Sequence, residues 1–169
     1  MTVISTRLLA VAMLTVAVAT AGFVDLPPAQ AAARSVSSNS RIPIEAPLNT
    51  VFDPCTGELV QGSGFVHVVH HVTFDANGVV RVVVHGNAQG VSGVGLTSGM
   101  QYRATGAVTK TFSIPASALP YPFLLEADVQ LIAPGPSNNL RARLTLSEVV
   151  NPDGTVAGTL VSITPLSCV

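Results

Sequence analysis

The longest regular pattern of hydrophobic and polar positions lies in residues 64–87. Two runs rich in Val and His flank a turn signal that extends from Asp75 to Gly78, and β-branched residues favour strands over helices. Asp at the first turn position and Gly at the left-handed position are typical of a hairpin loop with a bulge. The segment therefore predicts one long β-hairpin in which Asp75 lies opposite Val79.

This turn also decides which side chains share a face of the hairpin. The first face is almost wholly apolar, and we expect it to form core; it carries Val72, Phe74, Val80, Val82, Val84 and a single polar residue, His70. The second face carries three of the four histidines together with Arg81; they are His67, His71 and His85. His70 is predicted to be a neutral imidazole with one hydrogen bond or a polar group of a pocket.

The rest of the chain repeats the pattern of strand, turn and strand. Strand-like runs occupy residues 102–112, 121–133, 139–150 and 155–167. A second hairpin signal, Asn-Pro-Asp-Gly, occupies residues 151–154. Sustained helical periodicity is absent after the N-terminal segment, so we expect at most one helical turn, near residues 117–119. The pattern predicts an all-β fold, an antiparallel up-and-down meander of six strands.

Two cysteines, Cys55 and Cys168, lie near opposite ends of this region. An even number of cysteines in an exported chain predicts a disulfide bond. In a six-stranded meander the first strand begins, and the last strand ends, at the same end of the sheet. The bond would place these two strands side by side, so we predict that the sheet closes into a small β-barrel, with a β-sandwich as the alternative.

The N-terminal region has the features of an export signal. Arg7 precedes an apolar run over residues 8–23, and small residues suited to cleavage follow. The run is shorter than the roughly 20 residues that span a bilayer. We therefore predict a signal peptide over residues 1–33 and a secreted protein with no membrane contact after its removal. Residues 34–50 are predicted to be a disordered tail that becomes an extended arm, and residues 51–169 the folded domain.

Charge narrows the classes of partner. The formal net charge is −1, and charged residues make up 10% of the chain, where about 25% is usual. A basic surface of the kind that binds nucleic acid is absent from the sequence. We therefore expect no nucleic-acid partner.

The three histidines of the second face are secondary candidates for a metal site. His67 and His71 are four residues apart on one strand, about 13 Å, and the predicted register places His85 opposite the residue between them. Because a zinc ion needs ligands about 2 Å away, we expect His67, His71 and His85 to bind no metal tightly. No cofactor is predicted.

Glycines at 90, 93, 95 and 99 mark a long loop. The segment lacks the Gly-Lys-Ser/Thr of a phosphate loop and the Gly-x-Ser-x-Gly of a nucleophile elbow. We predict a flexible rim loop that could gate a ligand. We expect Gly78→Val to damage folding more than Gly99→Val, because Gly78 needs a positive φ and the loop can adjust.

Two carboxylates, Glu126 and Asp128, alternate on one strand face, within cross-strand reach of Arg141 and Arg143. The simplest interpretation is a solvent-facing ladder of ion pairs. The spacing of the acids also suits glycosidases, but no other residue pattern supports that chemistry.

Four stretches carry a resemblance to known proteins: PCTGE (54–58), GFVHVVHHVTFDANG (64–78), NAQGVSGVGLTSGMQY (87–102) and GPSNNL (135–140). They resemble a group of small exported bacterial proteins without an assigned activity, and the likeness spans most of the predicted domain. It implies a single exported β-domain and brings no catalytic motif. By architecture alone the chain is also similar to calycin, dirigent and allene-oxide-cyclase barrels.

We therefore expect a non-enzymatic barrel that holds a small apolar ligand. The candidate ligand-binding residues are His70, Tyr102, Arg103 and Tyr121. One alternative is an enzyme of the cyclase or isomerase type, and another is a surface interaction protein, for which a second copy of the chain is one partner. An internal cavity of several hundred Å³ would favour the first two hypotheses over the third.

Overall fold

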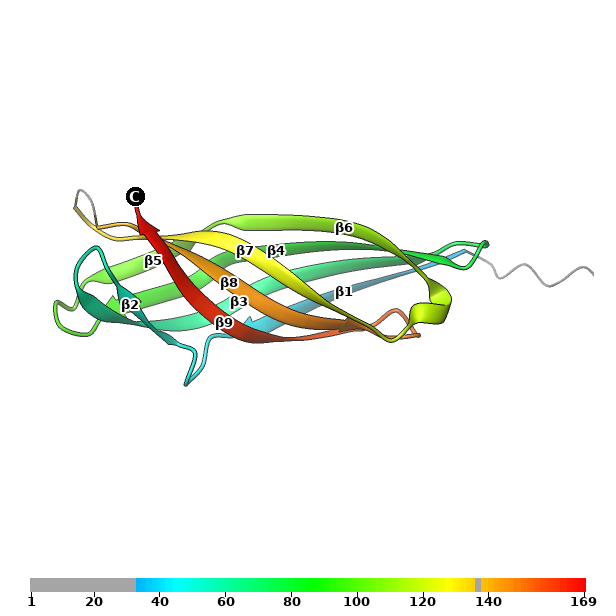
Figure 1. Cartoon of the computed structure of the whole chain (residues 1–169), viewed down its shortest axis with the longest axis horizontal. Helices are drawn as coiled ribbons and strands as arrows, with labels where there is room; N and C mark the ends of the chain where they lie inside the picture. Colours follow the sequence, from blue (N-terminus) through cyan, green and yellow to red (C-terminus); the bar gives the residue numbers. More distant parts are fainter. Residues whose placement is uncertain (1–32, 136–137) are drawn as a thin grey trace, which may run out of the picture.

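The computed structural model describes residues 33–135 and 138–169, so the predicted signal segment lies outside the described residues except for Ala33. The described residues form nine strands and one 3-10 helix: β1 (Arg34–Pro43), β2 (Thr50–Asp53), β3 (Glu58–Phe74), β4 (Val79–Gly95), β5 (Gln101–Thr105), β6 (Ala107–Pro115), η1 (Ala116–Ala118), β7 (Tyr121–Ile132), β8 (Leu140–Val150) and β9 (Val156–Cys168). All strand pairs are antiparallel (Figure 1). The predicted all-β antiparallel class is confirmed, and so is the short helical turn.

The long hairpin of β3 and β4 has the predicted register. The Asp75 amide donates to the Val79 carbonyl at 2.9 Å, and Gly78 has a φ of 74°. The Asp75 carboxylate also accepts from the amides of Asn77 and Val79, both at 2.8 Å. Phe74 pairs with Val80, as expected when the loop chemistry alone sets the register.

The N-terminal arm differs from the prediction. Residues 34–43 form β1, which pairs with β3 from Phe65 to Phe74, so the expected disordered tail is wrong for these residues and the folded region begins near Arg34. Ser and Asn favour strands poorly. The exposed edge of β3 supplies a ladder of backbone partners for this stretch, and that long-range contact is invisible in the local sequence.

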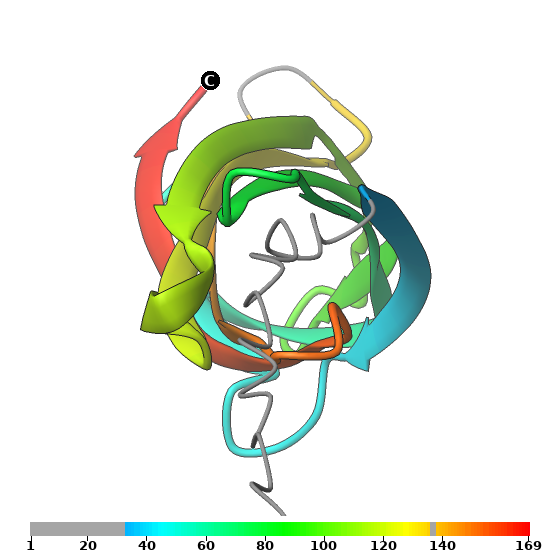
Figure 2. The same cartoon turned by 90° about the vertical axis from the view of Figure 1, so that its right-hand side faces the viewer.

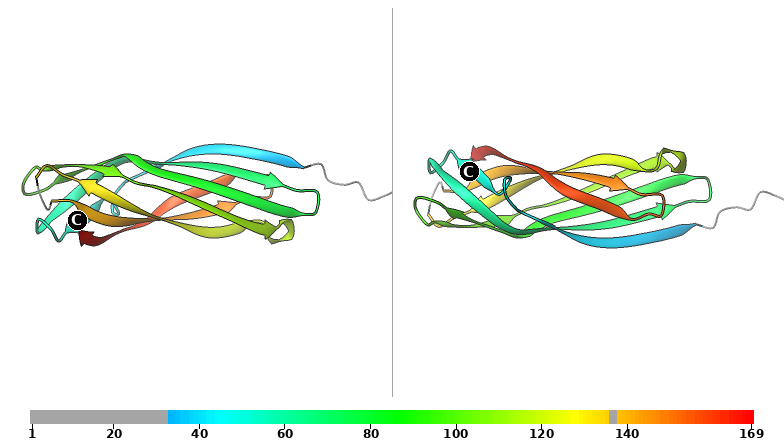
Figure 3. Two further views of the ribbon diagram at one scale, coloured as in Figure 1. Left: turned by 90° about the horizontal axis from the view of Figure 1, so that it is seen from above. Right: turned by 90° about the horizontal axis from the view of Figure 1, so that it is seen from below.

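The sheet curls around one core but does not close. Its order is β1-β3-β4-β5-β7-β8-β9, with β2 on β3 and β6 on β4. Figure 2 shows the curved cross-section, and the right panel of Figure 3 shows β9 in red and β1 in blue as separate strands that both face the viewer. In the described part of the chain no ladder joins β1 to β9, so the closed barrel is wrong and the β-sandwich alternative fits better.

The sheet stays open because two strands, β1 and β2, share the same edge of β3. Short β2 pairs with one end of β3, over Glu58 to Gln61, and β1 with the other end. Between these two strands the chain leaves the edge of β3, so β9 faces an interrupted edge. The predicted disulfide is confirmed: Cys55 and Cys168 are bonded, with Cα atoms 5.5 Å apart. The bond holds the turn after β2 to the end of β9 without completing the sheet.

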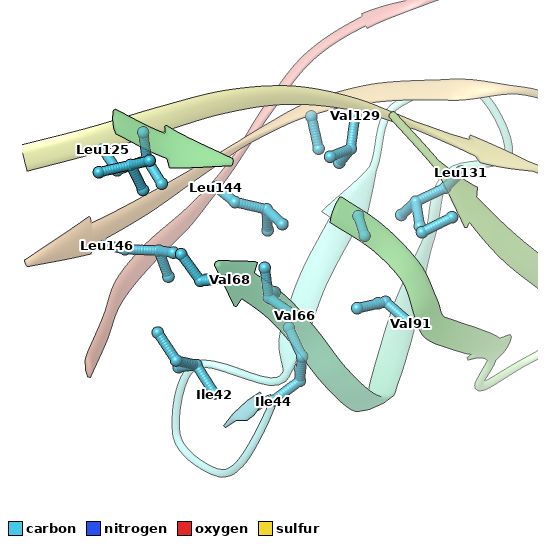
Figure 4. Packing of buried hydrophobic residues seen from close by; sticks show 14 of the residues in the cluster. Ile42, Ile44, Val66, Val68, Val91, Leu125, Val129, Leu131, Leu144 and Leu146 are labelled. Carbon is cyan, nitrogen blue, oxygen red and sulfur yellow. The ribbon is translucent and has the colours of Figure 1, made fainter. Parts of the chain in front are cut away.

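Side chains fill the interior. Figure 4 shows Val66 and Val68 of β3 pointing toward Leu144 and Leu146 of β8, and all four are almost fully buried. A hollow among Val60, Val91, Leu131 and neighbouring core residues has a volume of about 20 Å³, which is room for about one water molecule. A ligand inside a barrel would need a cavity of several hundred Å³. The hollow among these core residues is far smaller than that.

Candidate functional site

A cluster of three polar side chains interrupts the apolar core. The side chains are Ser38 on β1, His70 on β3 and Glu148 on β8, and the last two are 1% and 0% exposed. His70 Nε2 lies 3.1 Å from Glu148 Oε1. Burial of a carboxylate costs several kcal/mol unless it is paired, so the contact with His70 offsets part of the cost of burying Glu148.

Strand register brings the three side chains together. Ser38 lies directly opposite His70 in the β1–β3 ladder. Glu148 lies opposite Gly158 of β9, where an added Cβ atom would come within 2.8 Å of the Glu148 Cγ. Gly158 therefore leaves the space that the glutamate side chain occupies.

Each member of the cluster has one polar atom without a hydrogen-bond partner. These atoms are Ser38 Oγ, His70 Nδ1 and Glu148 Oε2, and they are the only such buried side-chain atoms in residues 33–135 and 138–169. When Nε2 of His70 donates to Glu148 Oε1, Nδ1 of the same ring is left as an acceptor. The atoms without a partner are therefore two acceptors and one hydroxyl group.

Aromatic side chains border the cluster on the β7 side. Phe123 lies opposite Glu148 in the β7–β8 ladder. Its ring centroid is 4.9 Å from that of Phe112, and Phe112 is 6.0 Å from Tyr121. The cluster is thus bordered by an aromatic group on the β7 side.

A surface cleft lies beside the cluster, between the two sheet edges. It has a volume of about 250 Å³; its walls include Ile42, Pro43 and Leu48 on one side, with Gly158, Thr159 and Leu160 on the other. Glu45 contributes a carboxylate to the lining. Gly158 lines the cleft and lies opposite Glu148, so this one residue separates the cleft from the buried cluster.

Of the four predicted ligand-binding residues, only His70 belongs to this cluster. Tyr121 is half-buried and packs near Phe112, and Arg103 is exposed on β5. Tyr102 is buried elsewhere: its hydroxyl donates to Asp53 Oδ2 at 2.8 Å, beside the turn that carries Cys55. Burial raises the pKa of Tyr102, and the Asp53 carboxylate adds to the effect. Tyr102 is therefore bound to the turn that carries Cys55 and lies outside the cluster.

Two members of the cluster were missed by sequence reasoning. Ser38 lies in the stretch expected to be disordered, and its local sequence has no signal of burial. Glu148 does have a signal, because strict alternation in β8 places it on the inner face with Leu144 and Leu146. A carboxylate on an apolar strand face is the pattern that could have identified it.

The remaining polar groups lie elsewhere. Asp128 accepts hydrogen bonds from Arg141 at 2.7 Å and from Arg143 at 2.8 Å. These bonds lower the pKa of Asp128, and the bond from Arg143 has the larger effect. Both arginines are more than 40% exposed, so the expected solvent-facing ladder is confirmed for Asp128. Glu126 lies opposite Thr145 instead.

The glycine-rich loop is anchored, in contrast to the predicted flexible gate. Glu58 accepts hydrogen bonds from the Thr97 and Ser98 amides at 3.0 and 2.9 Å, and from the Ser98 hydroxyl at 2.6 Å. Gly99 has a φ of 73°, nearly that of Gly78. The expectation that Gly99→Val is much milder than Gly78→Val therefore loses its basis.

The outward-facing histidines separate into two groups. His71 Nδ1 lies 2.7 Å from Ser37 Oγ, whereas His67 and His85 line one surface cleft. Within the described residues, no three His, Cys, Asp or Glu side chains are arranged to hold a metal ion.

Comparison of the chain with protein-family models, with curated proteins and with solved structures gave no match. None of the helices in the described residues is long and apolar enough to cross a membrane.

Proposed function

We propose that the protein is an exported, non-enzymatic binding protein for a small apolar molecule that carries a hydroxyl or amino group. The observation that carries the proposal is that Gly158 alone separates the apolar cleft from the buried Ser38, His70 and Glu148 cluster. The volume of the cleft, about 250 Å³, is just below the usual range for ligand pockets. This site replaces the barrel interior as the location of the ligand.

The chemistry of the cluster selects the ligand's polar group. Two atoms without partners, His70 Nδ1 and Glu148 Oε2, are acceptors when the glutamate is ionised. They therefore complement a donor, and Glu45 at the cleft adds negative charge. A carboxylate ligand would be repelled, while an alcohol or amine would satisfy the cluster and bury its apolar part against Ile42 and Leu160.

Binding is favoured over catalysis by the arrangement of the cluster. An acyl-transfer triad needs a hydrogen bond between nucleophile and base, and within the described chain the Ser38 hydroxyl has no such partner. The hollow in the core, about 20 Å³, is also too small for a cyclase substrate. Export is proposed from the signal-like N-terminus together with the disulfide, since such bonds persist in oxidising compartments.

Calorimetric titration of the purified protein with hexan-1-ol, hexylamine and hexanoate tests the proposal. We expect the alcohol and the amine to compete for one site and hexanoate not to bind. Thr159→Trp should obstruct the cleft and abolish binding. Thr164→Trp, an exposed position on the same strand outside the cleft lining, is the matched control. Equal binding of hexanoate, or equal loss in both tryptophan variants, would contradict the proposal.

A surface interaction is the second candidate function, favoured by an exposed apolar row at one end of the molecule. Phe52 of β2 lies opposite Leu59 of β3, and the Leu96 amide donates to the Leu59 carbonyl at 2.8 Å. All three side chains are about half exposed. Self-association through this row would make the sedimentation coefficient increase with concentration, and Leu96→Ser would remove that increase.

A further inference from the structure

The buried cluster is covered by strands on two sides. Its three unpartnered atoms, on Ser38, His70 and Glu148, are buried. On the side of the cleft, Gly158 of β9 separates them from the opening. On the other side β1 lies on the edge of β3, with Ser38 opposite His70. The polar group of a ligand therefore reaches these atoms only when one of the two covering strands moves.

Of these two strands, β1 is the less firmly attached. β9 is joined to β8 along its length and to Cys55 through the disulfide, and its Val156, Leu160 and Ile163 pack against the core. Residues 34–41 of β1 contribute no side chain to that core, and in the described residues β1 pairs with β3 alone. Segments with few buried apolar contacts open at a lower free energy than core strands. β1 is thus the strand that opens first.

The C-terminal end of β1 is fixed in the core. Ile42 is 4% exposed, and Ile44, just beyond the strand, is 5% exposed. The Ile44 amide also donates to the Gly64 carbonyl at 3.0 Å. Because both isoleucines stay buried, an opening of residues 34–41 pivots near Ile42.

The N-terminal end of β1 is held by Arg34. Its Nη2 donates to the Pro152 carbonyl at 2.8 Å, and its guanidinium carbon lies 4.1 Å from the ring centroid of Phe74. The other side-chain hydrogen bonds of β1 in the described chain go to β3. Gly154 of the β8–β9 turn lies against Val36, since an added Cβ atom there would be 2.9 Å from the Val36 Cγ2. Arg34 therefore ties β1 to that turn through an exposed hydrogen bond.

We propose that residues 34–41 form a strap that gates the buried cluster, with Arg34 as its latch. The strap detaches from β3, pivots near Ile42 and admits the polar group of the ligand. When it opens, His70 loses the strand that covers it, and the Glu148 carboxylate lies 3.1 Å beyond the His70 Nε2. The cleft is unaffected, because its wall on the β1 side begins at Ile42. The inference rests on the proposed function, since it concerns the entry of the same ligand.

Amide hydrogen exchange of the purified protein tests the strap without a ligand. We expect residues 34–41 to exchange faster than β8, which has a ladder on each side. Arg34→Gln should speed exchange in the strap by about fivefold, because it removes a charged hydrogen bond and a cation–π contact. Arg41→Gln is the matched control: Arg41 is also exposed on β1, and its side chain has no hydrogen bond in the described residues. Its exchange should equal that of the parent.

A crosslink between β1 and β3 tests whether the opening admits the ligand. Ser37 and His71 lie opposite each other, with Oγ 2.7 Å from Nδ1, and opposed residues of an antiparallel pair are close enough for a disulfide. Ser37→Cys/His71→Cys should slow the association of hexan-1-ol, measured by magnetic resonance exchange spectroscopy, at least about tenfold relative to Ser37→Ala/His71→Ala, because the open fraction falls. Peptide mapping verifies that the two new cysteines are bonded to each other.

The outcomes separate this inference from the proposed function. If the parent does not bind hexan-1-ol, the proposed function fails, and the role of the strap as an entrance fails with it. If the parent binds and the crosslinked variant associates as fast as the alanine control, the proposed function stands and the strap is overturned. Equal exchange rates in Arg34→Gln and Arg41→Gln would overturn the latch.

Discussion

His70 Nε2 and Glu148 Oε1 lie 3.1 Å apart although 78 residues separate them in the chain. Their strands, β3 and β8, are not neighbours in the sheet: each is next to one of the two edge strands that face each other across the opening. The pair therefore joins the two sides of the open sheet from within. In the described residues it links two sides of the sheet that no strand ladder joins.

Removing one partner of this pair should destabilise the fold strongly. In Glu148→Met the imidazole of His70 remains buried without its partner, and breaking a buried pair typically costs about 3–5 kcal/mol. The double variant His70→Leu/Glu148→Met replaces both polar groups by apolar ones and should be more stable than Glu148→Met. Urea unfolding measures the free energy of unfolding of both variants. If the loss of unfolding free energy in the double variant equals the summed losses of Glu148→Met and His70→Leu, the two residues are not coupled.

The parts of the fold that local chemistry determines could be predicted from the sequence. The turn from Asp75 to Gly78 specifies its own hydrogen bonds, so the register of β3 and β4 and the burial of His70 followed from it. Alternation along 140–150 would likewise have placed Glu148 inside. The second hairpin behaves in the same way: the Asn151 amide donates to the Thr155 carbonyl at 2.8 Å.

The parts that depend on distant contacts could not be predicted. Ser38 lies in a strand whose ladder partners are in β3, beyond the intervening β2, and its own sequence has no alternation of apolar residues. The closed barrel was inferred from six strands and one disulfide. The short β2 and the edge strand β1 change that geometry, because they divide the edge of β3 that β9 would have had to meet.

The disulfide should contribute about 4–5 kcal/mol to stability on the chain-entropy model, since it links residues 113 positions apart. Cys55→Ser/Cys168→Ser should lower the urea midpoint accordingly. Alkylation of the denatured parent without reductant, followed by intact-mass measurement, should find no free thiol. Two alkylated cysteines in the parent would contradict the bond.

Glu58 should make stability depend on pH in the acid range. Hydrogen bonds from Ser98 lower the pKa of Glu58 below its ordinary value of 4.5. The bond from the Ser98 hydroxyl has the largest effect, and the bond from the Ser98 backbone amide comes next. A carboxyl group whose folded pKa is depressed stabilises the fold fully above its unfolded pKa and loses that contribution as pH falls through the folded pKa. In Glu58→Gln the fall in melting temperature below pH about 4.5 should be shallower than in the parent.

Glu126→Gln provides the comparison for this effect, because Glu126 is an exposed acid on β7 without a hydrogen bond in the described residues. Its melting temperature should follow that of the parent across the same pH range. Identical pH profiles for Glu58→Gln and the parent would show that the anchor of the loop at 96–99 does not contribute to acid stability.

Tyr102 and Tyr121 should respond differently to loss of the hydroxyl group. In Tyr102→Phe the buried Asp53 loses its hydroxyl donor, and a hydrogen bond to a charged group is worth about 1.5–3 kcal/mol. Tyr121→Phe removes a hydroxyl that has no hydrogen bond in the described chain, so its unfolding free energy should change little. Because Tyr102 lies away from the cleft between β1 and β9, Tyr102→Phe should retain hexan-1-ol binding while it loses stability. Loss of that binding in a folded Tyr102→Phe protein would instead return Tyr102 to the ligand site.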